Sequence, residues 1–361
     1  MEGAGCYGQN GSDDAAADAV ILAQAIGRPV RVQWTRRDEF VWEPKSPAMV
    51  TEVHGGLDNQ GNIVAWDYHV WSPSHAKRPR FAGQLVTAQL ISGQPAPQAR
   101  VSFGAERNAP TNYAFSTQST QRVTVHYVPN SFLRVSSFRS LGGSMNTFAN
   151  ESFIDELATA AGVDPVEYRL RYLADPRERA VLMAAVEKAG WDPRPSPRTD
   201  ETELPEGEGR GVAFARYEND QAIVACIAEV QVEKSTGVVR VKRIVVAHEC
   251  GLIINPDGVK NQIEGNIIQS LSRALKEEVQ FDELGITSVD WQTYPILTFS
   301  EVPEIEIVLI NRPDQPAMGA GEPATVITAP AVANAIFDAT GVRMRQIPFV
   351  PQRVRAALLI S

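Results

Sequence analysis

The segment FRSLGGSMNTFANESFIDELATAA, residues 138–161, joins a glycine-containing turn to a run with helical periodicity. Apolar side chains recur along this run at intervals that place them on one face of a helix. Gly162 follows directly and is a typical helix terminator. We therefore expect a helix over 146–161, whose apolar stripe consists of Phe148, Phe153, Ile154, Leu157 and Ala161.

Strand and helix signals alternate on both sides of this segment. Strands are predicted over 30–34, 63–71, 122–135, 222–232, 238–247 and 304–310. Further helices are predicted over 15–26, from the capping signal at 164–167 onward, and over 177–189, 262–276 and 331–339. This order predicts an α+β fold of two elongated lobes, with mixed sheets and flanking helices.

Two stretches lack periodicity. Residues 192–209 combine prolines with acidic residues and are the best linker candidate, which divides the chain into lobes over 1–195 and 207–361. Residues 72–120 are rich in Pro, Gln, Ser and Ala, and we expect a long surface excursion there.

Composition narrows the classes of function. The chain has 361 residues, and 43% hydrophobic and 21% charged side chains provide for sizeable cores. A net charge of −9 disfavours nucleic acid as a partner, and no apolar run is long enough to span a bilayer. Cys6, Cys226 and Cys250 are too few for a disulfide framework or a four-cysteine iron–sulfur site. The start shows no signal-peptide pattern and resembles a chain entered in the middle.

Three glycine-rich turns, at 3–8, 142–143 and 319–321, are expected to precede helices. Glycine lets backbone N–H groups approach an anion, and a helix N-terminus adds a favourable dipole. Together the turns could cradle a cofactor that carries phosphate, or they could simply make tight turns. The first resembles a dinucleotide fingerprint, but no strand precedes it.

Three candidate side-chain sites accompany these turns. Glu322 lies between glycines and a proline, and a desolvated carboxylate there would suit a general base. Arg139 could bind an anion or pair with Glu151 or Asp155. The run 248–250, His-Glu-Cys, has metal-binding side chains, but neighbours on a strand point to opposite faces, so we expect a strand end with a buried cysteine and no metal.

In chain order, four motifs resemble the molybdenum hydroxylases, the xanthine dehydrogenase and aldehyde oxidase family. The likeness is strongest to the large subunits of the isoquinoline 1-oxidoreductase and nicotinate dehydrogenase branch. The motifs are GAGCYG at 3–8, FRSLGG at 138–143, NPD with QIEG at 255–257 and 262–265, and GAGE with AVANA at 319–322 and 331–335.

The resemblance implies a molybdopterin-binding domain holding molybdenum, with the pterin in its cytosine dinucleotide form. Glu322 would be the general base in hydroxylation of an N-heteroaromatic or aldehyde substrate, with water as the oxygen source. Electrons would leave through [2Fe–2S] clusters on a small partner subunit. The residues implied to contact the cofactor are Gly5, Cys6, Tyr7, Gly8, Phe138, Arg139, Gly142, Gly143, Gly319, Ala320 and Gly321.

Departures from the family pattern refine these expectations. Gly5-Cys6-Tyr7-Gly8 stands where the family usually has Gly-Gly-Phe-Gly. Purine hydroxylases have an acidic residue and an aromatic residue at the places that Gly11 and Leu141 occupy here, and this difference disfavours xanthine as substrate. Large subunits of the family are longer and contain a Gly-Gln-Gly turn. We therefore expect the missing N-terminal half as a separate chain, a cytoplasmic location, and a periplasmic one if that half carries a signal. The alternative is a non-catalytic scaffold of the same fold without cofactor.

Overall fold

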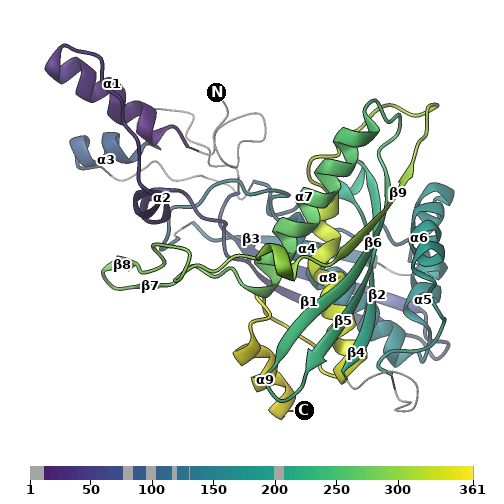
Figure 1. The fold of residues 1–361 in the computed structure, drawn as a ribbon. Helices are drawn as coiled ribbons and strands as arrows, with labels where there is room; N and C mark the ends of the chain where they lie inside the picture. Colours follow the sequence, from purple (N-terminus) through teal and green to yellow (C-terminus); the bar gives the residue numbers. More distant parts are fainter. Residues whose placement is uncertain are drawn as a thin grey trace.

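The structure is a computed structural model that describes residues 12–75, 84–94, 103–115, 120–129, 131–198 and 207–360. Two separate sheets dominate it (Figure 1). Helices cover both, and two hydrophobic clusters fill the space between the layers. The predicted α+β class with mixed sheets is confirmed.

The larger sheet has four strands in the order β4 (Glu208–Arg216), β5 (Ile223–Glu233), β6 (Val238–Glu249) and β9 (Glu304–Ile310). Neighbouring strands are antiparallel except β6 and β9, which run parallel. Most of β5 is buried, as expected for a central strand covered on both faces.

Helices α7 (Pro256–Leu275) and α8 (Pro323–Thr340) lie on one side of this sheet, and α6 (Pro176–Ala189) lies on the other (Figure 1). Two glycines of β4 let α8 approach closely. A Cβ atom at Gly209 or Gly211 would lie only 2.4 or 2.2 Å from a backbone oxygen of α8. This close contact places the start of α8 beside the end of β4.

The smaller sheet has the order β1 (Val50–Leu57), β2 (Ile63–Ser72) and β3 (Thr120–Tyr127). β1 and β2 form an antiparallel hairpin, whereas β3 is parallel to β2. Helix α4 (Gly143–Ala160) packs against it, followed by α5 (Pro165–Tyr172). Trp66 of β2 packs edge-on against Phe153 of α4 at 5.0 Å between ring centroids.

The remaining elements lie around the two sheets. Helices α1 (Asp14–Ile26), α2 (Arg36–Trp42) and α3 (Val86–Ser92), with the short strands β7 (Phe281–Asp282) and β8 (Gly285–Ile286), project to one side (Figure 1). Short 3₁₀ turns span Tyr217–Asn219 and Phe299–Glu301, and α9 (Pro351–Ile360) ends the described chain. None of the helices in the described ranges is long and apolar enough to span a membrane.

A buried ion network joins α4 to α5. Arg169, with no exposed surface, donates to Glu151 at 2.9 Å and to Asp155 at 3.3 Å. Glu151 also accepts from the Tyr113 hydroxyl at 2.8 Å and from the Phe214 amide at 2.9 Å. Because Phe214 belongs to β4, this network also fixes α4 to the larger sheet.

Most predicted elements are present, including the strand over 304–310 and the helix that ends at Gly190. The predicted strand over 30–34 is wrong, because these residues pair with no strand in the described chain. The strand predicted over 122–135 ends at Tyr127. β4 was not predicted, and α3 adds an unpredicted helix within 72–120.

The largest correction concerns the last predicted helix, which begins at Pro323 and not near Ala331. Pro330 resembles a helix start, yet it lies inside α8, where it is buried. Residues 199–206 of the predicted linker lie outside the described residues. The division into lobes over 1–195 and 207–361 stays a prediction.

Candidate active site

Glu322 is the residue immediately before α8, and its side chain is half-buried. One carboxylate oxygen, Oε1, accepts from the backbone N–H of Ser140 at 3.0 Å. The other, Oε2, accepts from the Tyr217 hydroxyl at 2.8 Å. Both oxygens are therefore oriented by donors from other parts of the chain.

Tyr217 begins the short turn that follows β4, and only 5% of it is exposed. Burial raises the pKa of its phenol well above the usual range, and the neighbouring charge of Glu322 raises it further. The phenol is therefore protonated and is a hydrogen-bond donor. Tyr217 is not among the residues predicted from the sequence, because β4, the strand that positions it, was not predicted either.

Arg139 ties together three segments. Its Nε donates to the carbonyl of Gly321 at 2.6 Å, and its other nitrogens donate to the side chains of Gln269 and Gln262, each at 2.9 Å. Glu151 and Asp155, the acidic partners considered for Arg139, instead bind Arg169. The arginine thus links the loop before α4 with α7 and with the turn before α8.

Asn266 of α7 supports the same turn from below and has no exposed surface. Its Nδ2 donates to the carbonyls of Gln262 at 2.8 Å and Ala320 at 3.4 Å. Its Oδ1 accepts from the Thr325 hydroxyl in α8. Asn266, Gln262 and Gln269 are not among the predicted site residues, although Gln262 belongs to one of the quoted motifs.

The turn at Gly319, Ala320 and Gly321 presents unused backbone donors. None of these three N–H groups donates to an acceptor among the residues that the structure describes. A Cβ atom at Gly319 would meet nothing within 4 Å. Helix α8 also begins without a side-chain cap. Consecutive free amides beside an uncapped helix N-terminus suit an oxygen-rich anionic group such as molybdopterin.

The other described glycine turn has a different surrounding. Gly142 and Gly143 are buried, and a Cβ at Gly142 would lie 2.7 Å from the Gly104 carbonyl oxygen. A Cβ at Gly143 would meet Asn108 and Val326 at 3.2 and 3.3 Å. Close packing of protein against protein therefore explains the absence of side chains here, and cofactor contact by these two residues stays a prediction.

Unusual backbone geometry is concentrated around the site. Within the described residues, five non-glycine residues have positive φ: Asn108, Ser140, Leu141, Glu218 and Asn219. Ser140 donates to Glu322, and Glu218 and Asn219 continue the turn of Tyr217. Asn108 joins them by accepting from the Glu218 amide at 3.0 Å. Such conformations are costly and are typical of functional sites.

The remaining predicted residues are placed as follows. Gly5, Cys6, Tyr7 and Gly8 lie outside the described residues. Phe138 is 38% exposed, and the Arg273 guanidinium lies 3.6 Å from its ring centroid. Thus the described part of the site consists of the loop before α4, the turn after β4, α7 and the turn before α8.

The 248–250 run contains no convergent ligand set. Glu249 binds Arg177 of α6 at 2.7 Å, whereas His248 and Cys250 are buried, with 0% and 2% exposure. Burial lowers the pKa of His248 to about 4, so its ring is neutral at pH 7. In the described part of the chain, no group of three or more His, Cys, Asp or Glu side chains is arranged to hold a metal.

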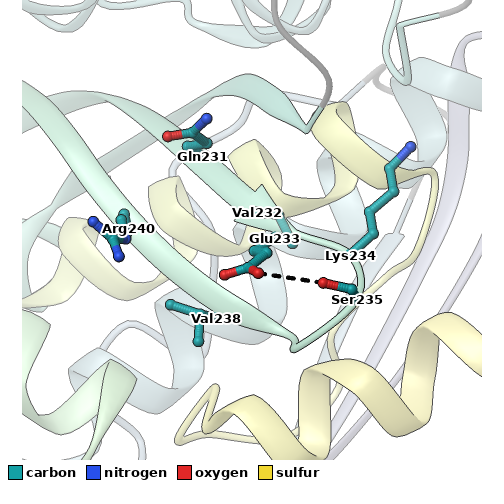
Figure 2. Close-up of a pocket in the computed structure, with 7 residues that line it drawn as sticks. All are labelled: Gln231, Val232, Glu233, Lys234, Ser235, Val238 and Arg240. Carbon is teal, nitrogen blue, oxygen red and sulfur yellow. Dashed lines mark hydrogen bonds between the residues drawn. The ribbon is translucent and has the colours of Figure 1, made fainter.

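An open hollow of about 380 Å³ lies at the turn between β5 and β6 (Figure 2). Its lining mixes charged and apolar side chains, and Ser235 donates to Glu233 at 3.3 Å. Ile223, at one end of β5, pairs with Arg216, the residue before Tyr217. The turn between β5 and β6 lies at the other end of β5, about 30 Å away at roughly 3.3 Å per residue. It is therefore separate from the Glu322 site. The lining residues are Gln231, Val232, Glu233, Lys234, Ser235, Val238 and Arg240.

Comparison with known proteins identifies the class to which this fold and site belong. Sequence profiles of the molybdopterin cofactor-binding domain match residues 5–90 and 143–303. The chain therefore carries molybdopterin-binding domains of the molybdenum hydroxylase family.

Among individual relatives, one of the subunits of nicotinate dehydrogenase from Pseudomonas putida is 45% identical over 99% of this chain and 30% of its own length. The beta chain of isoquinoline 1-oxidoreductase from Brevundimonas diminuta is 30% identical over 96% of this chain and 42% of its own length. The chain thus spans less than half the length of these relatives.

Solved structures agree on the fold. Quinoline 2-oxidoreductase from Pseudomonas putida 86 superposes with a TM-score of 0.73, at 15% identity, over 94% of this chain and 65% of that one. The Cu,Mo-CO dehydrogenase superposes with a TM-score of 0.69, at 14% identity, over 94% of this chain and 65% of that one.

Proposed function

We propose that this chain forms part of the active site of a molybdenum hydroxylase, with Glu322 as the general base. The observation that carries the proposal is the placement of Glu322 directly after three backbone amides that find no acceptor among the described residues, with both its oxygens held by donors. The site thus combines an anion cradle with an oriented proton acceptor.

When bound, molybdopterin supplies the molybdenum centre, which provides the oxygen nucleophile and accepts two electrons. The amides of Gly319, Ala320 and Gly321 would hold the anionic group by hydrogen bonds without the cost of reorganising solvent. Glu322 would accept a proton as the substrate is attacked. Arg139 would keep the glycine turn in place through its bond to Gly321.

The substrate class we propose is an N-heteroaromatic compound or an aldehyde. The names of the nicotinate and isoquinoline relatives support the first choice, and an aldehyde oxidoreductase that is 32% identical over a third of this chain supports the second. The predicted cytosine dinucleotide form of the pterin belongs to the same proposal.

We also propose two partners. One is a small subunit that carries [2Fe–2S] clusters, and the other is polypeptide that completes the cofactor site. The length of the relatives supports the second partner, because this chain accounts for 30% and 42% of the two described above.

The decisive variant is Glu322→Gln in the assembled complex, which keeps size and polarity but removes the base. We expect hydroxylation to fall by a factor of about 10² or more, at unchanged molybdenum content. Glu304→Gln is the control, because Glu304 is an exposed glutamate at the start of β9, and it should retain activity. Full activity in Glu322→Gln would refute the assignment of the base. A complex without molybdenum would instead favour the scaffold alternative.

A further inference from the structure

We infer that Tyr217 is the positioning residue that holds the Glu322 carboxylate in its orientation, through its hydroxyl bond to Oε2. This inference rests on the proposed role of Glu322 as a base. It assigns a function to a residue 105 positions away in sequence.

The Glu322 carboxylate has a different donor at each of its two oxygens, and Tyr217 is the donor to Oε2. The Ser140 amide donates to Oε1 at 3.0 Å, and the Tyr217 hydroxyl donates to Oε2 at 2.8 Å. A hydrogen bond to an ionised acceptor is roughly twice as strong as a neutral one. Loss of the phenol oxygen would leave Oε2 without that bond and would allow the carboxylate to turn about its single remaining partner.

Backbone hydrogen bonds fix the turn that carries Tyr217 and so orient its ring. The Tyr217 amide donates to the Ala222 carbonyl at 2.8 Å, and the Gln221 amide returns to the Tyr217 carbonyl at 2.9 Å. Glu218 and Asn219 follow with φ of 53° and 68°, in the left-handed region, which is uncommon for residues other than glycine and least favourable here for Glu218. The chain thus accepts backbone strain immediately beside the phenol that binds Glu322.

Three other charged groups surround this pair. Burial raises the pKa of Glu218, its ion pair with Arg107 opposes this, and the charge of Glu322 raises it further. Arg139 binds the carbonyl of Gly321, the residue before Glu322. These three residues are unchanged in a Tyr217→Phe variant, so a difference between the two proteins reports on the phenol.

The chain offers a matched control. Tyr113 is 6% exposed and donates to a buried glutamate, Glu151, at 2.8 Å, the same distance as between Tyr217 and Glu322. Tyr113→Phe therefore removes an equivalent hydroxyl bond at a purely structural carboxylate. It measures what the loss of such a bond does to folding alone.

The test compares Tyr217→Phe, Tyr113→Phe and Glu322→Gln in the assembled complex. For Tyr217→Phe we expect kcat to fall about tenfold with KM changed less than about twofold. Tyr113→Phe should lower the melting temperature and leave both kcat and KM unchanged.

Infrared spectroscopy of the assembled complex at fixed pH provides a readout besides activity. The carboxylate stretching band that disappears in Glu322→Gln should change its frequency in Tyr217→Phe, because Oε2 loses its hydrogen bond. An unchanged band and an unchanged kcat would overturn the role of Tyr217 while leaving the base assignment intact. Full activity in Glu322→Gln with a shifted band would instead retain the Tyr217 contact and refute the proposed function.

Discussion

The guanidinium of Arg139 donates from Nε to the backbone carbonyl of Gly321 at 2.6 Å, across 182 positions of sequence. Two glutamines of α7 accept from its remaining nitrogens, so the planar fork of arginine is used in full. This contact unites two motifs that are far apart in the chain. It also makes Arg139 more than a source of positive charge.

Arg139→Lys keeps the charge but cannot bond to all three acceptors. We expect a loss of about 2 kcal/mol in the free energy of unfolding, measured by denaturant titration, and reduced molybdenum in the assembled complex. Arg122→Lys is the control, because Arg122 makes a two-pronged pair with Asp67 but is 69% exposed. Equal stability of Arg139→Lys and the parent would contradict this prediction.

The glycine turns respond differently to added side chains. Gly142→Ala places a Cβ 2.7 Å from the Gly104 oxygen and 2.8 Å from the Ala105 oxygen, so we expect a loss of about 1–3 kcal/mol from overpacking. Gly319→Ala meets nothing within 4 Å and should leave the melting temperature unchanged. If Gly319 faces the cofactor as proposed, Gly319→Ala should lower molybdenum content. The reverse order of stabilities would show that the packing of the two turns is misassigned.

The buried network around Arg169 should dominate local stability. Glu151→Ala leaves a fully buried guanidinium without its main partner, and we expect a loss of about 3–5 kcal/mol in denaturant unfolding. Glu167→Ala, which removes an exposed pair with Arg171, should cost at most about 0.5 kcal/mol. Comparable losses in the two variants would mean that the burial of Arg169 is not important for folding.

Two buried histidines should make the protein acid-sensitive. Burial lowers the pKa of both His75 and His248 to about 4, below the ordinary 6.5. The unfolded chain therefore takes up protons first, so the stability is complete above pH 6.5 and declines as the pH falls toward 4. At pH 5 each histidine should cost on the order of 2 kcal/mol.

The measurement is the free energy of unfolding from pH 7 to pH 4. His248→Leu should flatten this dependence, because neither ring nitrogen of His248 has a hydrogen-bond partner in the described chain. His54→Leu, at an exposed position, should not change it. A parent protein whose stability is constant over this range would contradict the prediction.

Local signals account for what could be predicted from the sequence. Asp164 accepts from the amides of Val166 and Glu167, and Gly190 ends α6 in the left-handed conformation. Such caps act within a few residues, which is why sequence alone reveals them. The four ordered motifs also identified the family, and two of them contain the candidate site residues Arg139 and Glu322.

The features that were not predicted from the sequence depend on contacts between distant segments. The alternating pattern that reveals an exposed strand is absent from β4, which is almost wholly buried, so neither β4 nor Tyr217 was predicted. Pro330 was misleading because α8 continues through it within the core. In both cases, packing against the rest of the fold outweighs the secondary structure that the local sequence favours.

The sequence by itself therefore determined the family and several helix ends, and it singled out Arg139 and Glu322 as candidate site residues. Only the tertiary structure decided that Tyr217 meets Glu322 and that Arg139 meets Gly321. The physical reason is that the first contact requires α8 to lie directly on β4, which the bare backbones at Gly209 and Gly211 permit. The second requires α4 to pack against α8. No local pattern encodes an approach between segments more than a hundred residues apart.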